Sequence, residues 1–245
     1  MSKQQGKIEI TTGNTAFGQS ALAVATGANN TAMGKSALAV NSTGASNTAI
    51  GQNALAANTT GGTNTAIGQN ALALATIGAD NTVIGSSSSS LAVVSGNSNT
   101  VIGSTAAMFL STGNNNVVIG YNSAIFLSTG TGNTLIGKSA GGSISSGGNN
   151  TVIGTSAGSG LTTASNSIFI GTTVASLCTS SSNIVIGNTS ATGLTTGTSN
   201  IIMGNSAGNG ITTGSQNTII GSVIGLAAGL ANNVITGVNA MLFLY

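Results

Sequence analysis

The stretch Asn47-Thr48-Ala49-Ile50-Gly51-Gln52-Asn53-Ala54-Leu55 decides the fold, because it returns unchanged at residues 64–72. Its core, Asn-Thr-(Ala/Val)-Ile-Gly or a near relative, recurs at intervals of 16, 17 or 18 residues. Self-similarity at a fixed period is typical of proteins built from stacked units that are not stable singly. The closing glycines of the repeats are Gly18, Gly34, Gly51, Gly68, Gly85, Gly103, Gly120, Gly137, Gly154, Gly171, Gly187, Gly204, Gly221 and Gly237.

A period of about 17 residues is too short for helical repeats, which need about 33 or more. It fits one coil of a parallel β-solenoid, with two or three short strands separated by tight corners. The composition agrees, since Gly, Ser, Thr, Asn and Val are abundant and strong helix formers such as Glu, Lys and Arg are scarce. We predict an all-β fold, a parallel β-solenoid (β-roll or β-helix) of about 14 coils of about 17 residues stacked about 4.8 Å apart.

The predicted organisation has three parts: an N-terminal arm or cap at residues 1–13, the repeat domain at 14–237, and an apolar docking segment at 238–245. The residue four positions before each closing glycine is asparagine in every repeat except one, which has Ser167. Stacked asparagines can form a hydrogen-bonded ladder and tolerate the left-handed backbone of a corner. The predicted ladder is Asn14, Asn30, Asn47, Asn64, Asn81, Asn99, Asn116, Asn133, Asn150, Asn183, Asn200, Asn217 and Asn233.

Two adjacent apolar columns precede the glycine. Two residues before the glycine, the side chain is small in the first repeats, as at Ala16, and larger in later ones, as at Val83 and Phe169. A small residue three positions after the glycine and a later (Leu/Ile)-x-Thr-Gly corner predict a turn, a second short strand and another corner in each coil. The column next to the glycine is the predicted apolar ladder: Ile50, Ile67, Ile84, Ile102, Ile119, Ile136, Ile153, Ile170, Ile186 and Ile220, with Phe17, Met33 and Met203 as substitutes.

These adjacent columns have a consequence for assembly, because neighbouring residues of a strand point to opposite faces. One column therefore faces the interior of the coil and the other faces outward. A continuous outward strip of isoleucine is a larger apolar patch than monomers usually expose. Three rods around one shared apolar axis would hide the strip, as in a closed homo-oligomer. The alternative is a flattened monomer whose corner bends both side chains into one core.

The two ends of a solenoid expose unpaired strand edges, which proteins usually cap. Residues 1–13 carry Lys3, Lys7 and Glu9 and resemble a modest cap, whereas residues 238–245 are uncharged and apolar. We therefore hypothesise that rods join end to end into a filament. The candidate contact residues are Ile8, Ile10, Leu242, Phe243, Leu244 and Tyr245.

The composition argues against catalysis and against ligand chemistry. The chain has no histidine, and Glu9 and Asp80 lie several coils apart, so no carboxylate pair or metal cluster is expected. A net charge of +2 without a basic stripe or interleaved aromatics predicts no nucleic-acid partner. We expect no catalytic residues, no metal and no cofactor, and we do not expect an enzyme.

Several features bear on compartment. The lone cysteine, Cys178, excludes an intrachain disulfide framework and aligns with a column of hydroxyl residues such as Ser128 and Thr162. Residues 1–13 lack the apolar core of a signal peptide, and the apolar run 219–231 is too short to span a bilayer. We expect no membrane insertion, and a location in an extracellular filament or on a virion surface.

Residues 47–55 and 64–72 resemble the head repeats of trimeric autotransporter adhesins and are similar to repeats of some phage and giant-virus fibre proteins. The resemblance covers about residues 14–237. It implies a parallel β-roll, trimeric in the adhesins, with apolar residues of the repeated strand meeting at the threefold axis. Adhesin heads bind host surfaces, and fibre proteins build appendages. The longer coil and the lack of a visible signal peptide or coiled-coil stalk favour a viral or self-assembling fibre.

Three functions follow from these patterns. The first is a structural protein, a rigid oligomeric rod that builds a fibre or surface filament. The alternative is a receptor- or glycan-binding head, with candidate residues Phe109, Tyr121, Phe126 and the irregular stretch Ser86–Ser90. Ice binding is a minor alternative suggested by pairs such as Thr59-Thr60, although consecutive residues that point to opposite faces do not form a flat Thr-x-Thr array.

Overall fold

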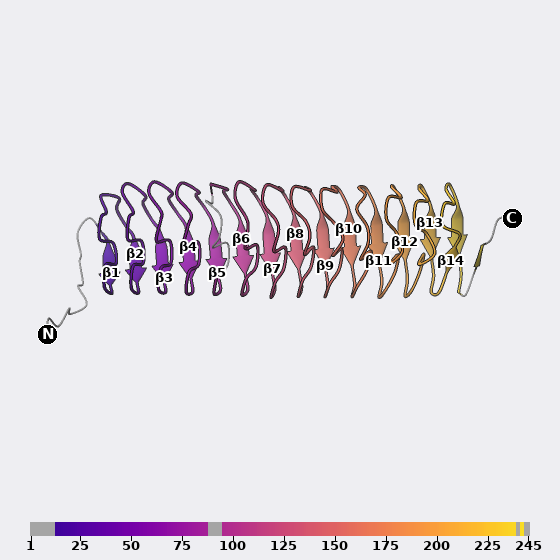
Figure 1. The fold of residues 1–245 in the computed structure, drawn as a ribbon, viewed down its shortest axis with the longest axis horizontal. Coiled ribbons are helices and arrows are strands. Elements are labelled where there is room, and N and C mark those ends of the chain that lie inside the picture. The colour runs from indigo at the N-terminus through magenta and orange to yellow at the C-terminus, as the bar shows by residue number, and fades with distance from the viewer. Residues whose placement is uncertain (1–12, 88–94, 239–240, 243–245) are drawn as a thin grey trace. The chain divides into compact units, whose positions relative to one another are not determined.

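The computed structural model describes residues 13–87, 95–238 and 241–242. The chain divides into two compact units, residues 1–119 and 120–245. In each unit the strands lie side by side in chain order and point the same way (Figure 1). The predicted fold class, an all-β parallel β-solenoid with a period of about 17 residues, is confirmed.

The first unit is a ladder of three-residue strands, each paired in parallel with the next. Equivalent residues of successive repeats stand opposite one another, as Ile50 does to Ile67. The strands are β1 (Thr15–Phe17), β2 (Thr31–Met33), β3 (Thr48–Ile50), β4 (Thr65–Ile67), β5 (Thr82–Ile84), β6 (Thr100–Ile102) and β7 (Val117–Ile119).

The second unit continues the same pattern within its own residues. A second, two-stranded sheet pairs β14 (Gly225–Leu226) with β16 (Met241–Leu242). The main ladder contains β8 (Thr134–Ile136), β9 (Thr151–Ile153), β10 (Ile168–Ile170), β11 (Ile184–Ile186), β12 (Ile201–Met203), β13 (Thr218–Ile220) and β15 (Val234–Thr236).

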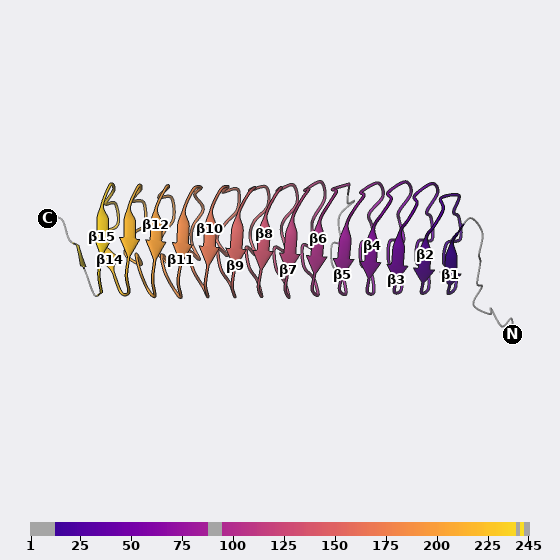
Figure 2. The same ribbon diagram turned by 180° about the vertical axis from the view of Figure 1, so that it is seen from behind.

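The second short strand predicted for each coil is wrong for most of the described chain. Only the coil that carries β14 has one, and the other described coils follow their strand with turns and bends (Figure 2). The reason is a left-handed backbone two and four residues after the glycine, as at Asn53 (φ +57°) and Leu55 (φ +50°). Residues in this conformation turn the chain and interrupt an extended segment.

Two physical constraints require glycine at the closing position of each repeat, as Gly51 illustrates. Its φ of +134° lies in a region that L side chains rarely adopt. A Cβ at Gly51 would also lie 2.5 Å from the carbonyl oxygen of Gly68 in the next coil. Neither the backbone angle nor the close stacking of coils allows a side chain here.

The asparagine column forms a buried hydrogen-bonded ladder inside each unit. Asn64 donates its backbone N–H (2.9 Å) and its Nδ2 (3.1 Å) to Oδ1 of Asn47, and Nδ2 also donates to the carbonyl of Gly78 (2.8 Å). At the natural break, Ser167 uses its Oγ to accept the backbone N–H of Asn183 (3.3 Å). Asn64 thus ties its own coil to both neighbours, because the same amide binds the coil before it and the glycine corner after it.

The core is filled in two complementary ways. In the first four coils a small strand residue packs with a leucine four residues after the glycine, as Ala49 does with Leu55. In the second unit a larger strand residue such as Phe169 replaces the alanine, and alanine or glycine replaces the leucine. A Cβ at Gly158 would lie 2.9 Å from Cδ2 of Phe169, so the ring occupies the space that a leucine side chain would need. Exchanging volume between positions keeps the interior close-packed.

The interpretation of Cys178 as a member of the hydroxyl column is wrong. Cys178 is fully buried, seven residues after its glycine, in the position that Leu161 and Leu194 occupy in neighbouring coils. The hydroxyl column continues instead at Thr179, whose backbone N–H donates to the carbonyl of Thr195 (2.9 Å). The segment between Cys178 and the asparagine of its coil, Asn183, is one residue shorter than in neighbouring coils. Counting back from the next glycine therefore places Cys178 one column too late.

Candidate functional site

The outward face of the strand ladder is the candidate functional site. In each strand of the two main ladders up to β13, the central residue is buried and both flanking residues are at least partly exposed. The alanine-to-phenylalanine column therefore faces the interior, and the isoleucine column next to the glycine faces outward. Phe17 exposes 54% of its surface and Met33 44%. These apolar side chains are exposed to water in the part of the chain that the structure describes.

A second outward column lies beside the isoleucine column, at the first residue of each strand. In the first unit this column is threonine in β1 to β6, for example Thr48 and Thr65. In the second unit it changes to isoleucine in β10, β11 and β12. These three strands are therefore apolar in both outward columns, with the side chains Ile168, Ile170, Ile184, Ile186, Ile201 and Met203.

Charge is absent from the strands of both ladders. Of the residues that the structure describes, the charged ones are Lys35, Asp80 and Lys138, and each lies in a turn or bend. Asp80 accepts a hydrogen bond from the hydroxyl of Thr63 in the preceding coil. The strands of the outward face thus present apolar and hydroxyl-bearing side chains but no charged group.

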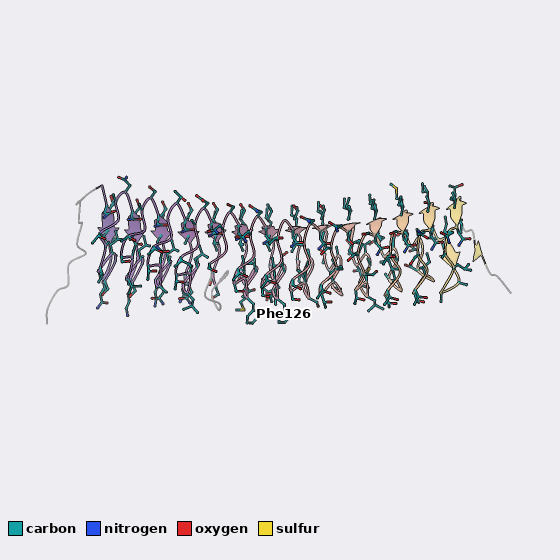
Figure 3. The ribbon with its side chains drawn as sticks, turned by 90° about the horizontal axis from the view of Figure 1, so that it is seen from above. Phe126 is labelled. Carbon is teal, nitrogen blue, oxygen red and sulfur yellow. The ribbon has the colours of Figure 1, made fainter. Side chains whose placement is uncertain are left out.

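The aromatic candidates for ligand binding lie in the turns that follow two of the strands. Tyr121 and Phe126 each expose 54% of their surface, but the buried Ser123 and Ala124 lie between them in the chain. Figure 3 shows Phe126 on the edge of its coil away from the strands. Phe109 is exposed in the first unit. Of the stretch Ser86–Ser90, residues 88–90 lie outside the described residues.

The threonine pairs proposed for ice binding lie in bends, where strand alternation does not apply. The first member of a pair uses its hydroxyl within the protein: Thr59 donates to the carbonyl of Thr76 (2.9 Å) and Thr195 to that of Thr212 (3.0 Å). One hydroxyl of each of these pairs is therefore engaged in holding successive coils together. This bond cannot be read from the sequence, because it depends on the side-chain direction in a bend.

The candidate end-to-end contacts fall mostly beyond the described residues. Leu242 lies in β16 and pairs in parallel with Leu226 of β14, so its backbone continues the stacking of the second unit. The other candidates, Ile8, Ile10, Phe243, Leu244 and Tyr245, lie outside the described residues.

The part of the chain that the structure describes has neither a metal-ion cluster nor a membrane-spanning helix. Within residues 13–87, 95–238 and 241–242, no three side chains of His, Cys, Asp or Glu gather where they could hold a metal ion. The same part of the chain contains no helix of the length and hydropathy needed to cross a membrane.

Comparison of the chain with protein-family models, with curated proteins and with solved structures gives no match. The class of protein that the fold defines is a β-solenoid repeat protein.

Proposed function

We propose that this chain is a non-enzymatic structural protein whose copies associate side by side, as a trimer, and end to end into a fibre or surface filament. The observation that carries the proposal is the outward isoleucine column, which is present in every strand of the main ladders up to β13, with Phe or Met as its substitutes. A regular apolar column of this kind is unfavourable in water and is removed from water by a second copy with the same column.

Two further features support a structural role. The chain carries charge on only 2% of its residues, so little electrostatic repulsion opposes close association of many copies. The repeat is held by backbone pairing and by the asparagine ladder in coil after coil, which suits a rigid spacer. The proposed location is an extracellular filament or a virion surface, as in the fibre proteins that the repeat resembles.

Negative-stain electron micrographs of the full chain test this proposal. We expect elongated particles wider than one solenoid, together with threads longer than a single chain can form. A field of single, separate solenoids at every protein concentration would contradict both modes of association.

A receptor- or glycan-binding head is the second candidate, and the exposure of Tyr121 and Phe126 favours it. Exposed aromatic rings stack on sugar faces and contribute strongly to recognition. A glycan array probed with the full chain tests this function, with Tyr121→Ala and Phe126→Ala as variants. Binding that both variants abolish would support a head, and absence of binding would leave the structural role.

A further inference from the structure

The outward faces of the two units differ in one respect that bears on where copies meet. In the first unit each of the strands β1 to β6 presents one threonine and one apolar side chain outward, and β7 presents two apolar ones, Val117 and Ile119. The second unit has three such strands in succession. In β10, β11 and β12 both outward positions are apolar. We name the side chains Ile168, Ile170, Ile184, Ile186, Ile201 and Met203 the isoleucine face.

This face has the layout of a protein interface within the second unit. Ile201 and Met203 expose 38% and 37% of their surfaces, and the other four side chains are half-buried. In the first outward column, isoleucine gives way to threonine on both sides of the isoleucine face: Thr134 and Thr151 in β8 and β9, and Thr218 in β13. In the second outward column these strands keep isoleucine, so the polar rim lies along the first column. An apolar centre with a polar rim is the usual anatomy of a protein–protein contact.

We infer that the isoleucine face is the site where a second copy of this chain docks, on the same face of its own second unit. The inference rests on the proposed self-association and specifies which strands anchor it. Two observations favour a second copy over a different partner: the spacing of the rows and the lack of charge. The area of the patch then sets how far the contact must extend.

The spacing of the rows selects a partner with the same repeat. The outward side chains of β10, β11 and β12 stand in successive rows about 4.8 Å apart, because paired strands fix that distance. A partner can fill the groove between every pair of rows only if its own side chains repeat at the same distance. A second copy meets this condition by construction, and three copies around a shared axis, as in the proposed trimer, bring the same rows together.

The lack of charge points the same way. The strands β8 to β13 contain no charged residue, so a partner that places a charge on this face would leave it desolvated and unpaired. The same face of a second copy brings only methyl groups and hydroxyls. Two such faces therefore meet without burying a charge.

The area of the patch shows how far the contact extends. Six partly exposed side chains present on the order of 300 Å² of apolar surface. A stable pair buries about 800 Å² per partner, so the isoleucine face alone is too small. The contact must include the flanking threonine rows, with the isoleucine face as the centre on which the binding energy concentrates.

The test compares the oligomeric mass of the full chain and of two variants by sedimentation over a range of concentrations. Ile184→Glu places a charge at the centre of the isoleucine face, on an outward side chain that leaves the core unchanged. Leu177→Glu is the matched control, because Leu177 is more exposed, at 58%, and lies in the turn of a neighbouring coil. Circular dichroism checks that all three proteins keep the same fold.

We expect Ile184→Glu to weaken association at least about 30-fold, as loss of a binding hot spot does, and Leu177→Glu to leave it unchanged. If the unmodified chain associates and Ile184→Glu associates equally well, copies meet elsewhere and this inference is overturned while the proposed function stands. If the unmodified chain is a monomer at every concentration, the proposed self-association fails, and this inference fails with it.

A second measurement reports contact directly. In a Cys178→Ala background, Ile184→Cys places one thiol at the centre of the isoleucine face. We expect oxidation to yield a chain-to-chain disulfide at this position, and the corresponding Leu177→Cys protein to yield none. A disulfide that forms only through position 177 would contradict the inference.

Discussion

Asn58 donates its Nδ2 to Oδ1 of Asn41, 2.7 Å away, whereas its own Oδ1 is buried and accepts no hydrogen bond within the described structure. The two residues form a short second ladder inside the first unit. Ala75 occupies the same column in the next coil, where a third asparagine would donate to that oxygen. The ladder ends one residue too early to satisfy its last acceptor.

Ala75→Asn should stabilise the chain for this reason. The new Nδ2 can donate to Oδ1 of Asn58 and to the carbonyl of Gly78, as Asn58 itself does to Asn41 and Gly61. Satisfying a buried acceptor contributes about 1 kcal/mol, which raises Tm by about 3 °C in a chain of this size. Ala75→Leu adds a side chain of similar size without a donor and is the control. Equal Tm values for the asparagine and leucine variants would contradict the hydrogen-bond explanation.

Asn64→Ala should be strongly destabilising, because it breaks the main ladder in the middle of the first unit. The backbone N–H and Nδ2 of Asn81 lose their acceptor, and the carbonyl of Gly78 loses its donor. Leaving buried polar groups unpaired costs about 2–4 kcal/mol in total. Chemical denaturation measures the loss.

Asn64→Ser provides a graded control for that experiment. A serine stands in this column at Ser167, where its Oγ accepts the next backbone N–H. The serine variant should therefore lose about half as much stability as the alanine variant. Equal losses would mean that the hydroxyl does not replace the amide oxygen.

Phe169→Ala and Gly158→Leu should compensate each other. Phe169 is fully buried, and its removal leaves a cavity that costs about 3–5 kcal/mol. Leucine at position 158 alone would collide with the ring, but leucine is the native residue of this column at Leu38 and Leu55. The double variant should be more stable than the sum of the single effects predicts, by about 1 kcal/mol or more. Simple additivity in thermal unfolding would refute the volume exchange.

Stability should fall at alkaline pH because of Cys178. Burial raises the pKa of its thiol, outweighing hydrogen bonds with Ser180 and Asn183 that lower it. The unfolded thiol loses its proton near pH 8.5, whereas the folded one retains it, so the unfolded state binds fewer protons above that pH. The free energy of unfolding should therefore decrease as pH rises above about 8.5, by at most about 1.4 kcal/mol per pH unit. Cys178→Ala should lack this component, and identical pH slopes for the two proteins would contradict it.

The sequence was sufficient for the main architecture. A fixed period and one asparagine column predicted stacked coils, and the adjacency of the two apolar columns predicted that one of them faces outward. These inferences work because strand alternation and the stacking distance are local properties of the backbone. The sequence could not decide which column faces inward, since alanine and isoleucine are both apolar.

The turn conformation, the column of Cys178 and the unpaired oxygen of Asn58 could not be predicted from the sequence. The turn after each glycine contains leucines with left-handed backbone, such as Leu55, and leucine is not a residue that signals this conformation. The sequence therefore predicts a second short strand in each coil where the structure has a turn. The sequence places Cys178 in the wrong column, because its coil lacks one residue between Cys178 and the following asparagine. The position of that gap within the coil cannot be read from the repeat alone. The unsatisfied oxygen of Asn58 depends on what stands one coil away.

The mass of the full chain in dilute solution, measured by sedimentation equilibrium, tests most directly whether the outward isoleucine column is covered by a second copy. We predict a particle of more than one chain, and in particular a trimer with three times the chain mass of 23.3 kDa. A well-folded particle of 23.3 kDa at all concentrations would show that the column stays in water and that the chain does not assemble through it.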